Sequence, residues 1–114
     1  MASTPDPVDE VVVVLVTGPD REALRRLGRR VVEERLAACA NILDGVSSVF
    51  HWEGEVQEES EALAILKTTR ARLEELQRRT LELHPYEEPE FLALPLAAGS
   101  ASYARWVLNS VERD

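Results

Sequence analysis

Residues 41–68 read NILDGVSSVFHWEGEVQEESEALAILKT, and their pattern decides the fold of this chain. Apolar and β-branched residues predict one long strand up to Trp52, interrupted near Asp44 and Gly45. The turn Glu-Gly-Glu at 53–55 leads into a returning arm, which is first rich in glutamate and then almost continuously apolar. The stretch therefore predicts a long β-hairpin whose polar half projects beyond the domain.

The segment before the hairpin predicts a strand and a helix. Residues 11–17 (VVVVLVT) are β-branched and almost wholly apolar, which is typical of a central strand covered on both faces. Asp20 can cap a helix that continues to about Cys39, and Gly28 within that helix indicates a close approach to another backbone. The apolar positions at helical spacing are Leu24, Leu27 and Val31.

The segment after the hairpin predicts a helix, a short strand and a last helix. The second helix is expected over residues 71–83, before Pro85, and the strand over residues 91–94. The second helix should bury Leu73, Leu76, Thr80 and Leu83. The last helix should bury Tyr103, Trp106, Val107 and Val111.

The order of these elements defines an α+β fold class. Strands and helices follow one another as βαββαβ, with an extra C-terminal helix. Because βαβ crossovers are right-handed, this order predicts a ferredoxin-like sandwich with the first two helices on one face of an antiparallel sheet. Residues 1–9 are expected to form a flexible N-terminal tail, and residues 10–114 a single domain.

Charge and cysteine content exclude several classes of partner. The chain has 13 basic and 21 acidic side chains, and its net charge of −8 repels nucleic acids and anionic membranes. Its single cysteine, Cys39, cannot form an internal disulfide, and the first ten residues lack the basic region of a secretory signal. A cytoplasmic protein is therefore expected.

Three segments resemble the CutA divalent-cation tolerance family in content, order and spacing. They are residues 34–56 (ERLAACANILDGVSSVFHWEGEV), 61–69 (EALAILKTT) and 84–90 (HPYEEPE), and the likeness covers about residues 11–108. The resemblance implies a ferredoxin-like subunit and a homotrimer whose hairpins continue their sheets across subunit boundaries. It also implies an association with copper and other divalent cations.

Cys39 and His84 are the candidate metal ligands. A Cys39 thiolate suits Cu(I) or zinc, but the residue can equally be a small buried hydrophobe. Some family members carry cysteine where this sequence has Val16 and Arg79, so Cys39 has no thiol companions. The His84 imidazole can bind a metal or move a proton, and the alternative is a helix-ending histidine bonded to a carbonyl.

Carboxylates follow His84 within a short loop bounded by prolines. Glu87, Glu88 and Glu90 can attract a hard or borderline cation there. No spacing matches an established metal site such as HExxH or paired CxxC, and acidic loops are commonly just solvated.

The segments that resemble the family also suggest an inter-subunit cleft. Lys67 and Glu90 are expected to line it, with Trp52 and Tyr86 as walls, so that lysine meets an anion or pairs with the glutamate. Glu61 belongs to the same set. The alternative is a structural ion pair with aromatic interface packing.

Two functions from different classes follow. The first is a trimeric cytoplasmic protein associated with divalent metal ion binding and tolerance, copper included, without an organic cofactor. The alternative is a PII-like regulatory or structural trimer that binds a small ligand or partner in its clefts and metals only weakly. An enzyme is not expected, because the sequence has no GxSxG motif and no glycine-rich phosphate loop.

Overall fold

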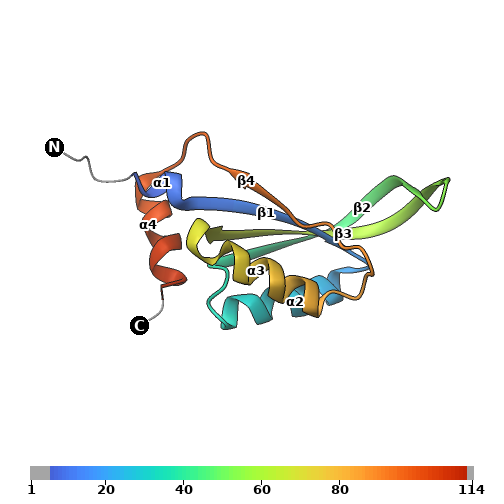
Figure 1. Cartoon of the computed structure of the whole chain (residues 1–114), viewed down its shortest axis with the longest axis horizontal. Coiled ribbons are helices and arrows are strands. Elements are labelled where there is room, and N and C mark those ends of the chain that lie inside the picture. Colours follow the sequence, from blue (N-terminus) through green and yellow to red (C-terminus); the bar gives the residue numbers. More distant parts are fainter. Residues whose placement is uncertain (1–5, 113–114) are drawn as a thin grey trace.

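A computed structural model of the chain describes residues 6–112 and contains one four-stranded antiparallel sheet in the order β2-β3-β1-β4. Two helices, α2 and α3, cover one face of the sheet, and α1 and α4 lie at one end of it (Figure 1). This arrangement confirms the predicted α+β class and antiparallel sheet. The elements are α1 (Pro7–Glu10), β1 (Val11–Gly18), α2 (Arg21–Glu33), β2 (Cys39–Trp52), β3 (Glu55–Thr69), α3 (Arg70–Leu83), β4 (Leu92–Pro95) and α4 (Ala101–Ser110).

The main core lies between the sheet and helices α2 and α3. Val14 of β1, Leu66 of β3, Leu24 of α2 and Leu76 of α3 are fully buried in it. Burying each such side chain stabilises the fold by about 1.5–3 kcal/mol. The predicted apolar faces of both helices are confirmed, because their remaining predicted members either are buried or pack against this core: Leu27, Val31, Leu73, Thr80 and Leu83.

Helix α2 begins as predicted and ends earlier than predicted. The Asp20 carboxylate accepts a hydrogen bond from the Ala23 backbone N–H at 2.8 Å, so it caps the helix. Helix α2 ends at Glu33 rather than near Cys39, because Arg35 adopts a left-handed conformation (φ 59°) and the chain turns. Cys39 is therefore the first residue of β2.

The close approach predicted from Gly28 is present. A Cβ atom added at Gly28 would lie 2.9 Å from the Cβ of Ala40 on β2. Only glycine therefore allows the helix to approach the strand to this distance.

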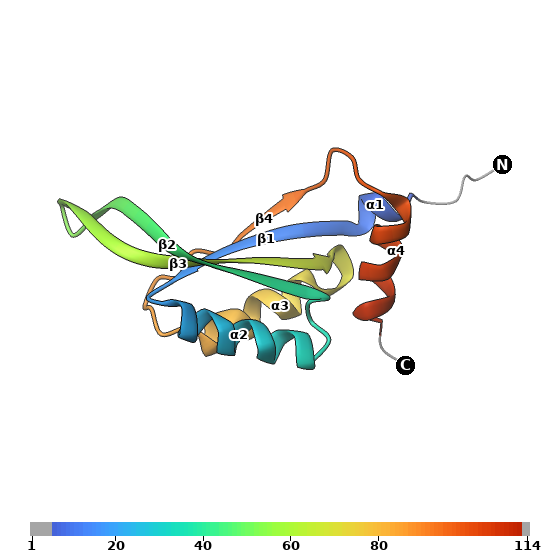
Figure 2. The same cartoon turned by 180° about the vertical axis from the view of Figure 1, so that it is seen from behind.

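Strands β2 and β3 form the predicted hairpin, which projects from the opposite end of the sheet from α4 (Figures 1 and 2). Asp44 and Gly45 together face Ala62 on β3, so the predicted interruption is a β-bulge. At the tip, Glu53 and Gly54 both have positive φ angles, 50° and 82°, as a type I′ turn requires. The projecting part, residues 46–60, is called the arm below.

The second face of the sheet is not covered by α2 and α3. Val13 and Leu15 of β1 are only half-buried on this side, whereas Val14 and Val16 are fully buried on the other side. The prediction that this strand is covered on both faces is therefore wrong within one chain. The strand registers define this open face as Val13, Leu15, Cys39, Asn41, Leu43, Leu63, Ile65, Lys67, Leu92 and Leu94.

The N-terminal segment is partly ordered, in contrast to the predicted tail. Residues 7–10 form helix α1, which is capped by the Asp6 carboxylate. Val8 is buried against Val107 of α4, so residues 7–9 belong to the domain. Residues 1–5 and 113–114 lie outside the described part of the chain.

Helix α4 buries a different face from the one predicted. Val107 and Val111 are buried as expected, together with Ala104. Tyr103 and Trp106 are about half exposed, and their rings form a pair with centroids 5.5 Å apart. No helix within the described residues combines the length and the apolar character needed to cross a membrane.

Candidate functional site

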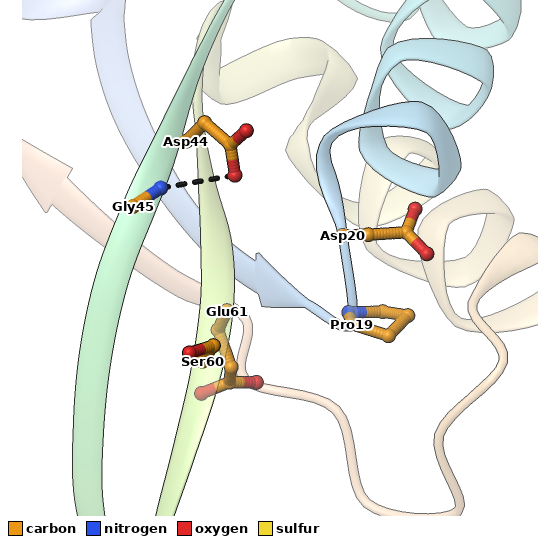
Figure 3. Close-up of a pocket in the computed structure, with 6 residues that line it drawn as sticks. All are labelled: Pro19, Asp20, Asp44, Gly45, Ser60 and Glu61. Carbon is orange, nitrogen blue, oxygen red and sulfur yellow. Dashed lines mark hydrogen bonds between the residues drawn. The ribbon is translucent and has the colours of Figure 1, made fainter.

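A groove of about 1040 Å³ lies between the arm and the loop that joins α3 to β4. Four of the five predicted cleft residues line it: Trp52, Glu61, Tyr86 and Glu90. A smaller hollow of about 580 Å³ shares Glu61 and continues toward Asp20 and Asp44 (Figure 3). The other residues lining the groove are Thr17, Pro19, Ser48, Val49, Phe50, Gln57, Glu59, Ser60, Pro85, Glu87, Glu88 and Pro89.

The hairpin register determines which arm side chains line this groove. In the antiparallel ladder Phe50 pairs with Gln57, and Ser48 pairs with Glu59. Side chains of directly paired residues lie on the same side of a sheet, and this side alternates along each strand. Ser48, Phe50, Trp52, Gln57 and Glu59 therefore share one side of the arm.

His84 fixes the loop on the other side of the groove. It is 7% exposed and ends helix α3, and its Nε2 lies 2.6 Å from the carbonyl oxygen of Thr17. A carbonyl only accepts, so Nε2 carries the proton, and Nδ1 accepts from the Tyr86 backbone N–H at 3.1 Å. Both ring nitrogens are thus engaged, which supports the alternative of a helix-ending histidine bonded to a carbonyl.

Tyr86 connects this loop to the sheet. Its hydroxyl donates a hydrogen bond to Oε2 of Glu61 at 2.7 Å. Burial raises the pKa of Tyr86 above its ordinary value, and the hydrogen bond to Glu61 raises it further. The phenol therefore stays protonated near neutral pH and remains a donor to the carboxylate.

Negative charge accumulates in the groove without a basic neighbour. Glu61 is only 9% exposed, and no ion pair within residues 6–112 involves it. Burial raises the pKa of Glu90, and the negative charge of Glu61 adds to this rise. The groove therefore disfavours a further negative charge.

Lys67 lies elsewhere in the chain. It is six positions beyond Glu61 on β3, about 20 Å along the strand. On the open face Lys67 donates a hydrogen bond to Oδ1 of Asn41, and its Nζ lies 3.9 Å from Sγ of Cys39. Within one chain Lys67 and Glu90 therefore do not meet, and their pairing across a subunit boundary stays a prediction.

The two candidate metal ligands also lie apart. Cys39 is half-buried at the start of β2. It pairs with Lys67 of β3, which in turn pairs with Val13 of β1. His84 instead contacts Thr17, further along β1. Val13 and Thr17 are separated by about 13 Å along β1. Within residues 6–112, no group of three or more His, Cys, Asp or Glu side chains is arranged to hold a metal ion.

Sequence reasoning missed three contributors to the groove region. Phe50 and Glu59 line it from the arm, and the Thr17 carbonyl anchors His84. A sequence signal existed for Glu59, because Gln57, Glu59 and Glu61 alternate with the period of a strand. No sequence signal identified the Thr17 carbonyl, since any residue has one.

These features define a class: an α+β protein with one antiparallel sheet, two helices on one face, and a long protruding hairpin. The family described as CutA1 divalent ion tolerance protein matches residues 12–110. The chain therefore belongs to the CutA1 divalent ion tolerance protein family, as its resemblance predicted.

Individual relatives agree with this assignment. The divalent-cation tolerance protein CutA of Thermus thermophilus is 46% identical over 95 residues, which are 83% of this chain and 92% of that protein. The chloroplastic protein CutA of Arabidopsis thaliana is 48% identical over 99 residues, which are 87% of this chain. The matched region spans only 54% of that plant protein.

Solved structures agree as well. The crystal structure of CutA1 from Oryza sativa has a TM-score of 0.88 and 40% identity, covering 95% of this chain and 99% of that one. The structure from Thermus thermophilus has a TM-score of 0.82 and 45% identity, with coverages of 85% and 94%.

The family description names tolerance of divalent ions and not a catalysed reaction, in agreement with the expectation that the chain is not an enzyme. Relatives differ in the compartment that their names give. The Arabidopsis protein is called chloroplastic, and a CutA structure from Archaeoglobus fulgidus is called periplasmic.

Proposed function

We propose that this chain forms a cytoplasmic homotrimer that binds divalent metal ions, copper among them, and contributes to tolerance of those ions. Family membership supports the link to divalent ions. The trimer is supported by the distribution of exposed apolar surface over the sheet and the arm.

Exposed apolar side chains concentrate on two adjoining surfaces. Of the ten large hydrophobic side chains exposed within residues 6–112, seven lie on the open face or the arm. Covering them with sister chains gains about 25 cal/mol for each Å² of apolar surface removed from water. The outer edge of β2 also offers unpaired backbone groups to a neighbouring strand. The seven residues are Leu43, Val49, Phe50, Trp52, Val56, Leu92 and Leu94.

The assembly is tested by sedimentation velocity on two matched variants. Leu94 on the open face and Leu81 on α3 are similarly exposed, 46% and 43%. Leu94→Glu should dissociate the trimer, because it puts a charge into the interface, and Leu81→Glu should leave it intact. A wild-type chain that sediments as a monomer at micromolar concentration contradicts the proposal.

For metal binding, Cys39 is the better placed of the two candidate ligands. Its thiol lies on the open face, where association brings sister chains together, whereas both His84 nitrogens already have partners. A thiolate suits Cu(I) and zinc. Calorimetric titration with each ion should show weaker binding in Cys39→Ala and little change in His84→Ala. Equal affinity in wild type and Cys39→Ala contradicts a thiol-based site.

The groove favours a second candidate function. A groove of about 1040 Å³ with Phe50, Trp52 and Tyr86 in its walls has the size of a small-molecule site. In this alternative the chain is a PII-like regulatory trimer that binds an organic ligand in inter-subunit clefts and metals only loosely. A ligand retained in the groove through purification, identified by mass spectrometry, would favour this candidate.

A further inference from the structure

We propose that Asp44 and Gly45, the two residues of the β2 bulge, form a site of spontaneous aspartate isomerisation, and that the product loosens the arm. The inference goes beyond the proposed function, because both reacting groups belong to one chain and no metal, ligand or sister chain takes part. Of the aspartates in the sequence, only Asp44 is followed by glycine. Glycine has no Cβ to shield its amide nitrogen, so the reaction is least hindered at this pair of residues.

The reaction uses only these two neighbouring groups and water. The backbone nitrogen of Gly45 attacks Cγ of Asp44 and loses its proton, while the neutral carboxyl group loses its hydroxyl, and the two leave together as one water molecule. The product is a five-membered succinimide ring. One water molecule then opens the ring. Opening at the Asp44 backbone carbonyl gives isoaspartate, whose main chain runs through Cβ, and opening at Cγ restores aspartate. No oxidant or reductant is needed.

The bulge holds the two reacting groups together. The Gly45 backbone N–H donates a hydrogen bond to Oδ1 of Asp44 at 2.9 Å, so the nitrogen lies against the carboxyl group that it attacks (Figure 3). Groups held in contact react faster than groups that meet by chance. Both residues lie opposite Ala62, and among the described residues neither has a partner of its own on β3. The Gly45 amide is therefore not fixed by the ladder of β2 and β3.

The surroundings of the bulge also favour the reaction. Asp44 and Gly45 are both exposed to solvent, and a Cβ atom added at Gly45 would meet nothing within 4 Å. The peptide unit thus has room to rotate as the ring closes. The Asp44 side chain faces Asp20 at the start of α2, with which it lines the smaller hollow (Figure 3). It therefore does not lie on the open face, which the proposed trimer covers.

Isoaspartate changes the arm through the bulge. It adds one carbon atom to the main chain of β2 and moves the carboxylate onto Cα. The pairing of residues 46–52 with β3 depends on the two-against-one arrangement at the bulge, which the longer main chain disturbs. Within residues 6–112, only β2 pairs with the arm half of β3, so no second strand holds the register there. The amides of the arm should then exchange their hydrogens faster.

Ageing of the full chain tests the reaction. Folded protein is incubated for weeks in mildly acidic buffer, in which a fraction of aspartate carboxyl groups is neutral. After digestion, the peptide containing residue 44 is analysed by chromatography and electron-transfer fragmentation, which distinguish isoaspartate from aspartate of equal mass. Isoaspartate should accumulate at residue 44 at least as fast in the folded protein as in the chain unfolded in urea. Its absence from residue 44, or its formation in the unfolded chain alone, overturns the inference.

Two matched variants assign the signal to Asp44. Asp44→Glu keeps the negative charge but needs a less favourable six-membered ring, so it should abolish isoaspartate formation. Asp9→Glu, at an exposed position of α1, should leave it unchanged. An isoaspartyl methyltransferase, which transfers a methyl group to isoaspartate, provides a second measure of the product. Equal methylation of aged wild type and aged Asp44→Glu overturns the inference.

Hydrogen exchange tests the effect on the arm. The isoaspartate form is separated from unreacted protein by chromatography, and the two are compared. Amides of residues 46–60 should exchange faster in the isoaspartate form, whereas the amides of Val14 and Leu66, whose side chains are fully buried, should stay protected in both. Equal exchange of the arm amides in the two forms overturns the proposed loosening of the arm.

Discussion

Both halves of β3 pair with β2, but only the half from Ala62 to Thr69 also pairs with β1. From Glu61 to Thr69 each residue is buried or half-buried, and alternate side chains enter the core. From Glu55 to Ser60 only Gln57 is not exposed. Pairing with one strand alone thus accounts for the arm within one chain, whereas a second strand and core packing hold the body. An isolated two-stranded hairpin is marginal in water, which supports the proposed covering of the arm by a sister chain.

The largest effect expected from this difference is in the body. Leu66→Ala should lower the free energy of unfolding by about 2–5 kcal/mol, because Leu66 is fully buried between the sheet and both helices. Val56→Ala in the arm, where the side chain is 65% exposed, should change it by less than about 0.5 kcal/mol in the monomer. Urea denaturation measures both. A similar loss in the two variants would show that the arm is packed as tightly as the body.

A second variant tests the contact of α2 with β2. Gly28→Ala should lower the free energy of unfolding by about 1–2 kcal/mol, because the added methyl group crowds the Cβ of Ala40 and outweighs the better helix propensity. Arg29→Ala, one position along on the exposed side, is the control for propensity. Chemical denaturation measures both variants. If Gly28→Ala is more stable than wild type, the helix can move away from the sheet.

A third variant tests the tip of the arm. Gly54→Ala should cost about 1 kcal/mol, because Gly54 has φ of 82° and has open space around it, so the cost comes from the backbone alone. The thermal midpoint of unfolding checks it. No change in midpoint would mean that the tip does not contribute to the cooperative unit, which would sharpen the contrast between arm and body.

The smallest effect concerns the pH dependence of the groove. Burial and the charge of Glu61 raise the pKa of Glu90, so the folded state holds that proton more tightly than the unfolded state. The resulting stability is fully present below the ordinary glutamate pKa of 4.5 and is lost as pH rises through the raised value. Glu90→Gln should remove this loss, and the variant should exceed wild type in stability at neutral pH only.

Urea denaturation between about pH 4 and pH 7 measures this dependence. Glu74→Gln outside the groove should keep the wild-type slope. If Glu90→Gln kept that slope too, the carboxylates of the groove would not interact in the folded state.

Local patterns in the sequence predicted most of the fold. The β-branched run of β1, the Asp20 cap and the close approach at Gly28 each depend on residues near one another in the chain or on glycine itself. The bulge at Asp44 and Gly45 was visible for the same reason, since it breaks a regular alternation.

Two of the errors have clear physical causes. Arg35, just after the end of α2, adopts a left-handed conformation, although glycine is the residue that usually occupies this position after a helix. Helix α4 carries apolar residues around much of its circumference, so its buried face depends on tertiary packing. Within one chain the register of two long strands pairs Lys67 with Cys39, and its place in an inter-subunit cleft stays a prediction.

The bulge also sets the composition of the groove wall. Asp44 and Gly45 occupy the space opposite Ala62 alone, so the alternation of β2 changes phase at this point. If Asp44 and Gly45 instead paired one to one with β3, the register beyond them would shift by one residue, and Phe50 and Trp52 would lie on the far side of the arm. The two-against-one pairing at the bulge, far from the tip, thus determines which side of the arm carries the aromatic rings.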